Sequence, residues 1–430
     1  MKRTILSEIP VEWTLFFPNA SEMKRKGFDD NISSCPAIFR DDCYARIPSR
    51  YLRERGAGNW YLDISGLENE GDPIAPTSQR NCGYSLLNFL KYSSAANLDL
   101  MSVTYDDVLG YQHDQVDGRW SSKGKKLSPS TANARADEAC SYLAWLAARG
   151  HRGPFEIKTR HVRTRRRGRN GYTGGLTRAR REKIRSGGLE VLNLPNEAEI
   201  QDWLASVRRL RGQAKMLNSR LIVEAALRKH EGCALTVDQW PSLDHINHSM
   251  SRGLPHVNLT VVVTKGSRPR VILIEVGFAK LVALWVAQQR PGLVDIYARR
   301  TGNEAPINLF VSDRAGYEGI PISPASLYLC FRPPVATFQP WYPHHGRHYW
   351  TCMSILKGLR RDAAAANFSL KNVTSGWVKG RIGYWIELAR RQLGHLSDET
   401  TELYMRWMMT QIELVGIADE YSDYLGAENA

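Results

Sequence analysis

Apolar residues recur at helical spacing along most of the chain, and one later region alternates in the manner of strands. Three helices are expected within residues 78–152. The first helix carries a run of apolar side chains around Leu86. Thr104 and Asp107 resemble a capping box for the second helix, and Ser128 opens the third. These signals predict a compact helical unit.

The second half of the chain combines helices with a hairpin. Asn196 is placed to cap a helix. Residues 257–263 and 270–274 alternate as two strands joined by a short turn. Residues 278–290 then follow as an amphipathic helix with Leu281, Leu284 and Trp285 on its apolar side. The pattern predicts a fold that is mainly α with a small antiparallel β-sheet.

Composition divides the chain into four expected parts. Residues 1–75 mix aromatic pairs with charge runs and form an N-terminal extension of unknown role. Residues 76–155 are the helical domain, residues 156–193 are a basic interdomain linker, and residues 194–430 are a second large domain. A chain of 430 residues with 43% hydrophobic residues can bury a core in each large domain.

Positive charge is concentrated in the linker. The formal net charge is +14, and residues 158–185 hold twelve lysines and arginines against one acid, Glu182. A basic block of this kind favours an anionic partner and binding that weakens steeply with salt. The candidate DNA contacts in it are Arg163, Arg165, Arg166, Arg167, Arg169, Arg180 and Arg181.

The seven cysteines include no Cys-x-x-Cys pair. An odd number without that spacing argues against a disulfide scaffold or a cysteine-rich zinc site, so a reducing, cytoplasmic compartment is expected. Glu8, Pro10 and Glu12 interrupt any signal-peptide core. No apolar stretch reaches the length of about 18 residues that a membrane span requires.

A tight turn near the C-terminus brings an imidazole close in sequence to a phenol. Gly394 is expected to end a helix, because glycine readily adopts positive φ, and His395 follows it. Ser397 then caps a helix that carries Tyr404. A tyrosine on an amphipathic helix is more often a half-buried core residue, so the turn alone assigns no chemistry.

Leu393-Gly394-His395 followed by Tyr404 resembles the signature of the tyrosine recombinase (phage integrase) family. Arg228, with Glu231 three residues later, resembles the first arginine box of that family. Taken by itself, this pair also fits an ordinary surface ion pair worth a few tenths of a kcal/mol.

Two further motifs match the family in chain order. Lys265 lies in the hairpin turn, where the family places a lysine, although a lone lysine there is usually solvated. His344-x-x-Arg347-His348 resembles the second box. A metal site is the alternative for these histidines, but an arginine among the ligands would repel the ion.

The chain departs from the family pattern in three places. Gly346 stands where the family usually has leucine, and His345 competes with His344 for the catalytic position. Residues 357–382 look like an insertion before the tyrosine helix. Gly346 and the insertion could support a protein that binds DNA without cutting it.

The resemblance implies a role for each matching side chain. Tyr404 would be the nucleophile, and Arg228 and Arg347 would grip the phosphate oxygens. The remaining roles would be His344 as base, Lys265 as general acid, His395 as donor to a phosphate oxygen, and Glu231 and His348 as supporting residues. No metal, ATP or other cofactor is expected.

The implied function is site-specific recombination or integration of a mobile element through a 3′-phosphotyrosine. The helical domain would be the core-binding, DNA-binding domain, and residues 194–430 would be the catalytic domain with a C-terminal helix. Expected partners are double-stranded DNA, three further copies forming a tetramer on DNA from a monomer or weak oligomer, and an accessory DNA-bending or directionality protein. The expected location is a prokaryotic cytoplasm at the nucleoid, with no membrane contact.

Three other functions remain open from the sequence. A type IB topoisomerase or telomere resolvase would use the same chemistry for a different outcome. A catalytically inactive protein of the same fold would bind DNA without cutting it. Metal-dependent hydrolysis by the histidine cluster is the third.

Overall fold

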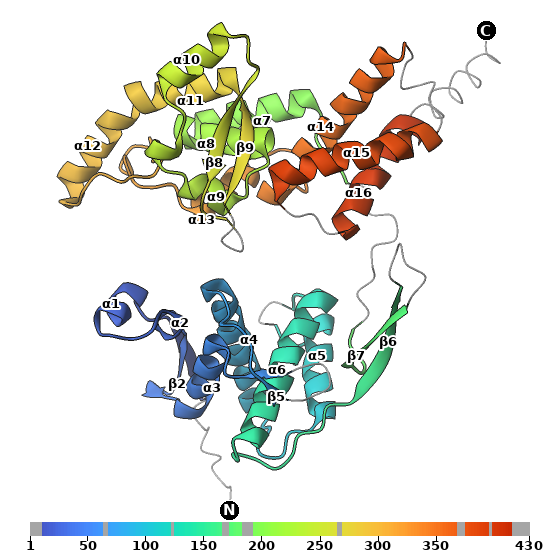
Figure 1. The fold of residues 1–430 in the computed structure, drawn as a ribbon. Helices are drawn as coiled ribbons and strands as arrows, with labels where there is room; N and C mark the ends of the chain where they lie inside the picture. The colour runs from blue at the N-terminus through green and yellow to red at the C-terminus, as the bar shows by residue number, and fades with distance from the viewer. Residues whose placement is uncertain are drawn as a thin grey trace, which may run out of the picture. The chain divides into compact units, whose positions relative to one another are not determined.

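The computed structural model describes residues 11–62, 68–121, 124–165, 172–182, 192–264, 269–367, 375–394 and 398–414. The chain divides into two units, residues 1–188 and 189–430 (Figure 1). Both units are mainly helical with small antiparallel sheets, which confirms the predicted fold class. No helix among the described residues is long and apolar enough to cross a membrane.

The first unit contains a three-stranded sheet, several helices and two hairpins. In chain order its elements are β1 (Trp13–Phe16), α1 (Ala20–Arg25), α2 (Asp30–Ser33), β2 (Ala37–Arg40), β3 (Cys43–Tyr44), α3 (Arg46–Ala57), β4 (Tyr61–Leu62), β5 (Glu68–Asn69), α4 (Pro76–Ala95), α5 (Tyr105–Asp117), α6 (Pro129–Ala148), β6 (Thr159–Arg165) and β7 (Tyr172–Arg178). The predicted capping box of Thr104 and Asp107 opens α5, and Ser128 caps α6.

Residues 11–62 share one hydrophobic core with α4, α5 and α6. Trp13, Tyr51 and Trp60 are each at most 8% exposed. Their polar atoms are also satisfied by the helices: Trp13 Nε1 donates to Ser94 Oγ at 2.8 Å, and Tyr51 Oη donates to Glu138 at 2.8 Å. The N-terminal segment therefore belongs to the same packed unit as the helices.

The basic block contains the β6–β7 hairpin, with Thr159 opposite Arg178 and Arg165 opposite Tyr172. Arg178 at the base of the hairpin is 6% exposed and donates to Asp137 Oδ1 at 2.8 Å and to Gln112 Oε1 at 2.7 Å. These buried bonds attach the base of the hairpin to α5 and α6.

The second unit holds the remaining elements. They are α7 (Glu197–Arg211), α8 (Gln213–Ala225), α9 (Lys229–Ala234), the 3₁₀ helix η1 (Val237–Gln239), α10 (Leu243–Ser251), β8 (His256–Val261), β9 (Arg270–Glu275), α11 (Val276–Gln288), α12 (Arg290–Thr301), α13 (Pro324–Tyr328), the 3₁₀ helix η2 (Leu329–Phe331), α14 (Pro343–Ala365), α15 (Ser375–Leu393), α16 (Asp398–Met409) and the π-helix η4 (Thr410–Leu414). As predicted, Asn196 caps α7 and strands β8 and β9 pair as a hairpin.

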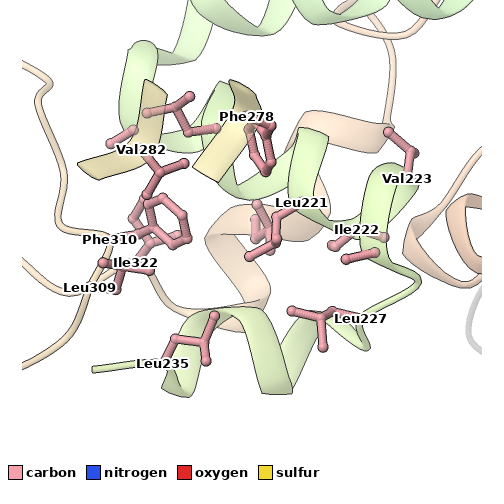
Figure 2. Packing of buried hydrophobic residues seen from close by; sticks show 14 of the residues in the cluster. Leu221, Ile222, Val223, Leu227, Leu235, Phe278, Val282, Leu309, Phe310 and Ile322 are labelled. Carbon is pink, nitrogen blue, oxygen red and sulfur yellow. The ribbon is translucent and has the colours of Figure 1, made fainter. Parts of the chain in front are cut away.

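One large core joins α7, α8, α11 and the β8–β9 hairpin to the segment before α14. Figure 2 shows Leu221 and Ile222 of α8 in this core together with Phe278, Phe310 and Ile322. The expectation for Leu281 was wrong: this residue is 36% exposed. Trp285 is buried as expected, and Phe278, Ala279 and Val282 form the rest of the core face of α11.

A second core lies between α14, α15 and α16, the three long helices at one end of this unit in Figure 1. Tyr404 is part of it at 1% exposure. The residues expected as an insertion, 357–382, form the end of α14 and the start of α15 where the structure describes them. Gly358 lets the two helices approach, because a Cβ there would lie 2.4 Å from the Trp385 ring.

Gly346 has a packing role that accounts for the departure from leucine. A Cβ at this position would lie 2.9 Å from Ile222 Cγ2 and 3.1 Å from Val223 Cγ1. The first turns of α14 therefore pack directly against α8, and a larger side chain has no room.

We predict that Gly346→Leu lowers the free energy of unfolding by about 1–3 kcal/mol, as overpacked core positions do. The matched control is Gly292→Ala on α12, where nothing lies within 4 Å of the added Cβ. That change should be neutral or stabilising by up to about 1 kcal/mol. Equal effects of the two changes in chemical denaturation would contradict the close approach of α14 and α8.

Candidate active site

Arg228 lies in the short connection between α8 and α9. Ala226 ends α8 with a left-handed φ of 56°, and buried Leu227 anchors the connection, so the chain turns before Arg228. Arg228 is then the N-cap residue of α9. Its backbone N–H donates to Glu231 Oε2 and its Nη1 to Glu231 Oε1, both at 2.8 Å.

Glu231 is 2% exposed, so its pairing with Arg228 is not a surface ion pair. Arg270 on β9 donates to the same carboxylate through Nη1 at 2.9 Å and Nη2 at 2.7 Å. Arg347 Nη1 lies 4.0 Å away. Burial by itself would raise the pKa of Glu231, but the hydrogen bonds from Arg270 and Arg228 outweigh it and lower that pKa, which keeps the carboxylate ionised.

Arg347 on α14 is the most buried of the three arginines, at 5% exposure. Its Nη2 donates to Leu393 O at 2.9 Å and its Nη1 donates to Ala226 O. Burial, and then the charge of Arg228, lower the pKa of Arg347 to about 10. The guanidinium therefore stays charged at neutral pH and is held by backbone carbonyls.

The hydroxyl of Tyr404 is hydrogen-bonded to His348 Nδ1 at 2.9 Å. Burial raises the pKa of Tyr404 to about 12, although a hydrogen bond with Thr351 acts in the opposite direction. Burial also lowers the pKa of His348 to about 3, with His344 adding to that effect. At neutral pH the phenol is therefore protonated and lies against a neutral imidazole.

A cleft of about 250 Å³ lies beside this cluster. Arg228, Lys229, His344 and Arg347 are among the residues that line it. The ring of His344 packs edge-on against His348 with centroids 4.5 Å apart. His345 is not among the residues that line this cleft, and its Nδ1 is hydrogen-bonded to Pro340 O at 2.7 Å.

These contacts connect the buried phenol to the cleft through two imidazoles. Within the described part of the chain, no group of three histidine, cysteine or acidic side chains is arranged to hold a metal ion. What the cluster can do chemically is bind an anion with two guanidinium groups and present a tyrosine beside a neutral histidine.

The cleft and the Glu231 cluster do not contain every residue that the sequence analysis named for the site. Lys265, His395, Arg166, Arg167 and Arg169 lie outside the described residues, as does Ser397. Arg163 and Arg165 are on strand β6. Arg180 pairs with Asp106 at 3.2 Å and Arg181 with Asp137 at 2.6 Å, so both positive charges are partly balanced within the unit.

Arg270 is a site residue that the sequence analysis did not find. It is the first residue of β9 and its side chain is 11% exposed. The sequence feature that could have pointed to Arg270 is its position, five residues after Lys265 in the same hairpin. No sequence pattern links it to Glu231, which lies 39 residues earlier.

No protein-family model matches the sequence, and neither does any curated protein. Solved structures do resemble the chain. XerH site-specific recombinase bound to palindromic difH substrate is 15% identical, covers 79% of each chain and has a TM-score of 0.49. A lambda integrase dimer bound to a COC′ core site is 12% identical, with 77% of this chain and 89% of that chain covered and a TM-score of 0.44.

The Tn1549 transposon integrase in complex with circular intermediate DNA is 12% identical. The match covers 77% of this chain and 94% of that chain, with a TM-score of 0.37. All three structures are recombinases or integrases solved with DNA. Since these TM-scores are below 0.5, a functional assignment has to rest on the side chains described above.

We predict that His348 makes the protein less stable as pH falls from about 6.5 toward 4.5. The pKa of His348 is lower in the folded chain than in the unfolded one, so the unfolded state binds the proton first and gains population. His348→Gln should flatten this part of the curve of unfolding free energy against pH. His245→Gln, on an exposed surface of α10, is the control and should leave the curve unchanged. A wild-type slope retained in His348→Gln would contradict the assignment.

Proposed function

We propose that this chain is a site-specific DNA recombinase of a mobile element, with the chemistry of the tyrosine recombinase family. It would cut and rejoin DNA strands through a 3′-phosphotyrosine. One observation carries the proposal: Arg228, Arg347 and His344 line one cleft, and the phenol of Tyr404 is hydrogen-bonded to His348, the residue after Arg347.

The charge of the cluster suits a phosphodiester. Three guanidinium groups surround the single carboxylate of Glu231, so positive charge is in excess in a mostly buried place. A phosphate in the cleft would balance that excess. Each guanidinium can grip two oxygens through its planar fork, which an ammonium group cannot do.

In the proposed reaction the Tyr404 oxygen attacks the phosphorus and displaces the 5′-oxygen of the DNA. The phenol proton passes to a histidine of α14: His348 holds the hydroxyl, and His344 lies between His348 and the cleft. Arg228 and Arg347 stabilise the charge that builds on the phosphate. Losing one such donor typically lowers a rate on the order of a hundred- to a thousandfold.

Lys265 and His395 complete the proposal through the family resemblance. Lys265 would protonate the leaving 5′-oxygen, and His395 would donate to a non-bridging oxygen. A 5′-hydroxyl from another strand can reverse the step, because the phosphotyrosine conserves the energy of the phosphodiester. Strand exchange by this route consumes no ATP and has no metal-dependent step.

Tyr404 is 1% exposed in the described state. Its oxygen can reach a phosphodiester only if α16 or a neighbouring segment moves. The proposed cycle therefore includes a withdrawn state, in which His348 holds the phenol, and an engaged state on DNA.

The partners follow from the chemistry. Exchange of two duplexes requires four active sites, so a tetramer on DNA is proposed, formed from a monomer or weak oligomer. An accessory DNA-bending or directionality protein is part of the proposal, as is a place at the nucleoid of a prokaryotic cytoplasm. Residues 76–155 would bind the core of the recombination site, residues 194–430 would cut it, and the basic segment of residues 156–193 would lie against its phosphates.

Tyr404→Phe is predicted to retain DNA binding and to form no covalent adduct, because only the nucleophilic oxygen is removed. The measurement is recovery of DNA from host cells lysed under denaturing conditions, followed by sequencing of the attached ends. Attached DNA from wild type alone would support the proposal. Adduct formed by Tyr404→Phe at the wild-type rate would rule out this nucleophile. Reversible, site-specific binding without an adduct from either protein would favour a DNA-binding protein that lacks catalysis.

Replacing Arg165, Arg166 and Arg167 with glutamine is predicted to weaken DNA binding and make its salt dependence shallower. For every phosphate that is no longer neutralised, the slope of log K against log salt should fall in magnitude by about 0.9. Arg208 and Arg209 of α7, replaced together, give a control outside the basic block. An unchanged slope in the triple variant would mean that this part of the block does not contact phosphates.

A further inference from the structure

We propose that Arg270 is a positioning residue of the cleavage site, which holds Glu231 and the C-terminal end of α15 in a single arrangement around the two phosphate-gripping arginines. The inference rests on the proposed function. It extends that function to a side chain that does not itself line the described cleft.

The C-terminal end of α15 is bound by three guanidinium groups. The carbonyl oxygens of its last residues, Gln392 and Leu393, and of Gly394 just after it accept hydrogen bonds in turn from Arg270 Nε at 3.2 Å, Arg347 Nη2 at 2.9 Å and Arg228 Nη2 at 3.3 Å. Carbonyls at a helix C-terminus have no partner inside the helix and lie at the negative end of its dipole. Arginine charge is therefore favourable there, and the helix end orients all three side chains.

Arg270 differs from the other two arginines in how its donors are used. Its Nε, Nη1 and Nη2 all donate to the protein, to Gln392 O and to both oxygens of Glu231. Arg228 and Arg347 line the cleft, and the side chain of each binds the described part of the protein through Nη1 and Nη2 only. The geometry therefore separates one arginine that fixes the arrangement from two that can contact a phosphate.

A second contact ties the same helix end to β9. Leu273 N donates to Gln392 Oε1 at 2.9 Å, and Gln392 Nε2 donates to Leu273 O at 2.9 Å. The side chain of Gln392 thus pairs with β9 as a neighbouring strand would. With Arg270 on the same strand, the hairpin and the end of α15 are joined at two points.

Without Arg270, Glu231 would keep only Arg228 at hydrogen-bond distance, with Arg347 4.0 Å away. The carboxylate would then draw these two side chains toward itself and away from a bound phosphate. It would also be deprived of the strongest hydrogen bonds that lower its pKa, so the pKa of Glu231 would rise. Both effects act on the chemical step more than on DNA binding.

The test measures adduct formation in a single turnover, together with DNA affinity, for wild type, Arg270→Gln and Arg270→Lys. Arg270→Gln should slow adduct formation by about a hundredfold, the cost of a small misplacement of reacting groups. DNA affinity should change by less than about threefold. Arg270→Lys should recover only part of the rate, because an ammonium group lacks the fork that reaches both Glu231 oxygens.

A pH profile separates positioning from a general loss of structure. The rate should fall as Glu231 becomes protonated, so the acid limb of the Arg270→Gln profile should move to higher pH. Adding Glu231→Gln to Arg270→Gln should cost much less than Glu231→Gln costs alone, because the two residues act as one unit. Arg290→Gln is the control: Arg290 is a half-buried arginine that donates to Asn308 O and Pro306 O, away from the cluster.

The inference is overturned if Arg270→Gln cuts DNA at the wild-type rate, if its profile does not shift, or if the costs of Arg270→Gln and Glu231→Gln simply add. An equal loss of rate in Arg290→Gln would also overturn it, since it would show a general effect of destabilisation. A wild-type protein that forms no adduct would refute the proposed function itself, and that outcome is distinct because it precedes any effect of Arg270.

Discussion

The candidate active site of the second unit depends on the interaction between the buried carboxylate of Glu231 and the arginines around it. A carboxylate at 2% exposure would be costly by itself, and it is stable here because guanidinium groups from three different elements surround it. Removing one partner of such a pair typically costs about 3–5 kcal/mol, since the remaining charge stays buried. α9, β9 and α14 are therefore held together by an interaction that tolerates little displacement.

Helix α14 brings the rest of the chemistry to this point. His344 lies three and four residues before Arg347 and His348, and Thr351 lies four and three residues after them, which places all four along one side of a helix. Gly346 faces α8 and lets that side approach the carboxylate cluster closely. Further along, Cys352 and Ile355 pack in the core that contains Tyr404. One helix thus orients an arginine toward the cleft and a histidine toward the phenol.

The first unit uses a similar combination of burial and charge for its basic hairpin. Arg178 is buried against Asp137 and Gln112, and Arg181 shares the same aspartate. The arginines near the base of the hairpin are therefore structural contacts within the unit. Arg163 and Arg165 lie on β6 of the same hairpin.

Local signals in the sequence determined much of the architecture. The capping boxes at Thr104 and Asn196 and the end of α15 at Gly394 each involve residues within a few positions of one another, so a linear pattern contains them. The alternation that predicts β8 and β9 is local as well. Arg228, Arg347 and Tyr404 were predicted as site residues because the motifs around them resemble those of the tyrosine recombinase family in the same order along the chain.

Only the tertiary structure decided which of these side chains meet. The bond between His348 and Tyr404 spans 56 residues, and the bonds of Arg270 to Glu231 and Gln392 span 39 and 122. Hydrophobic spacing placed Leu281 in the core, but the packing of α11 on its neighbours left it exposed. Periodicity specifies which face of a helix is apolar, whereas the angle at which that face meets other elements, and so the burial of Glu231, depends on the packing of the whole unit.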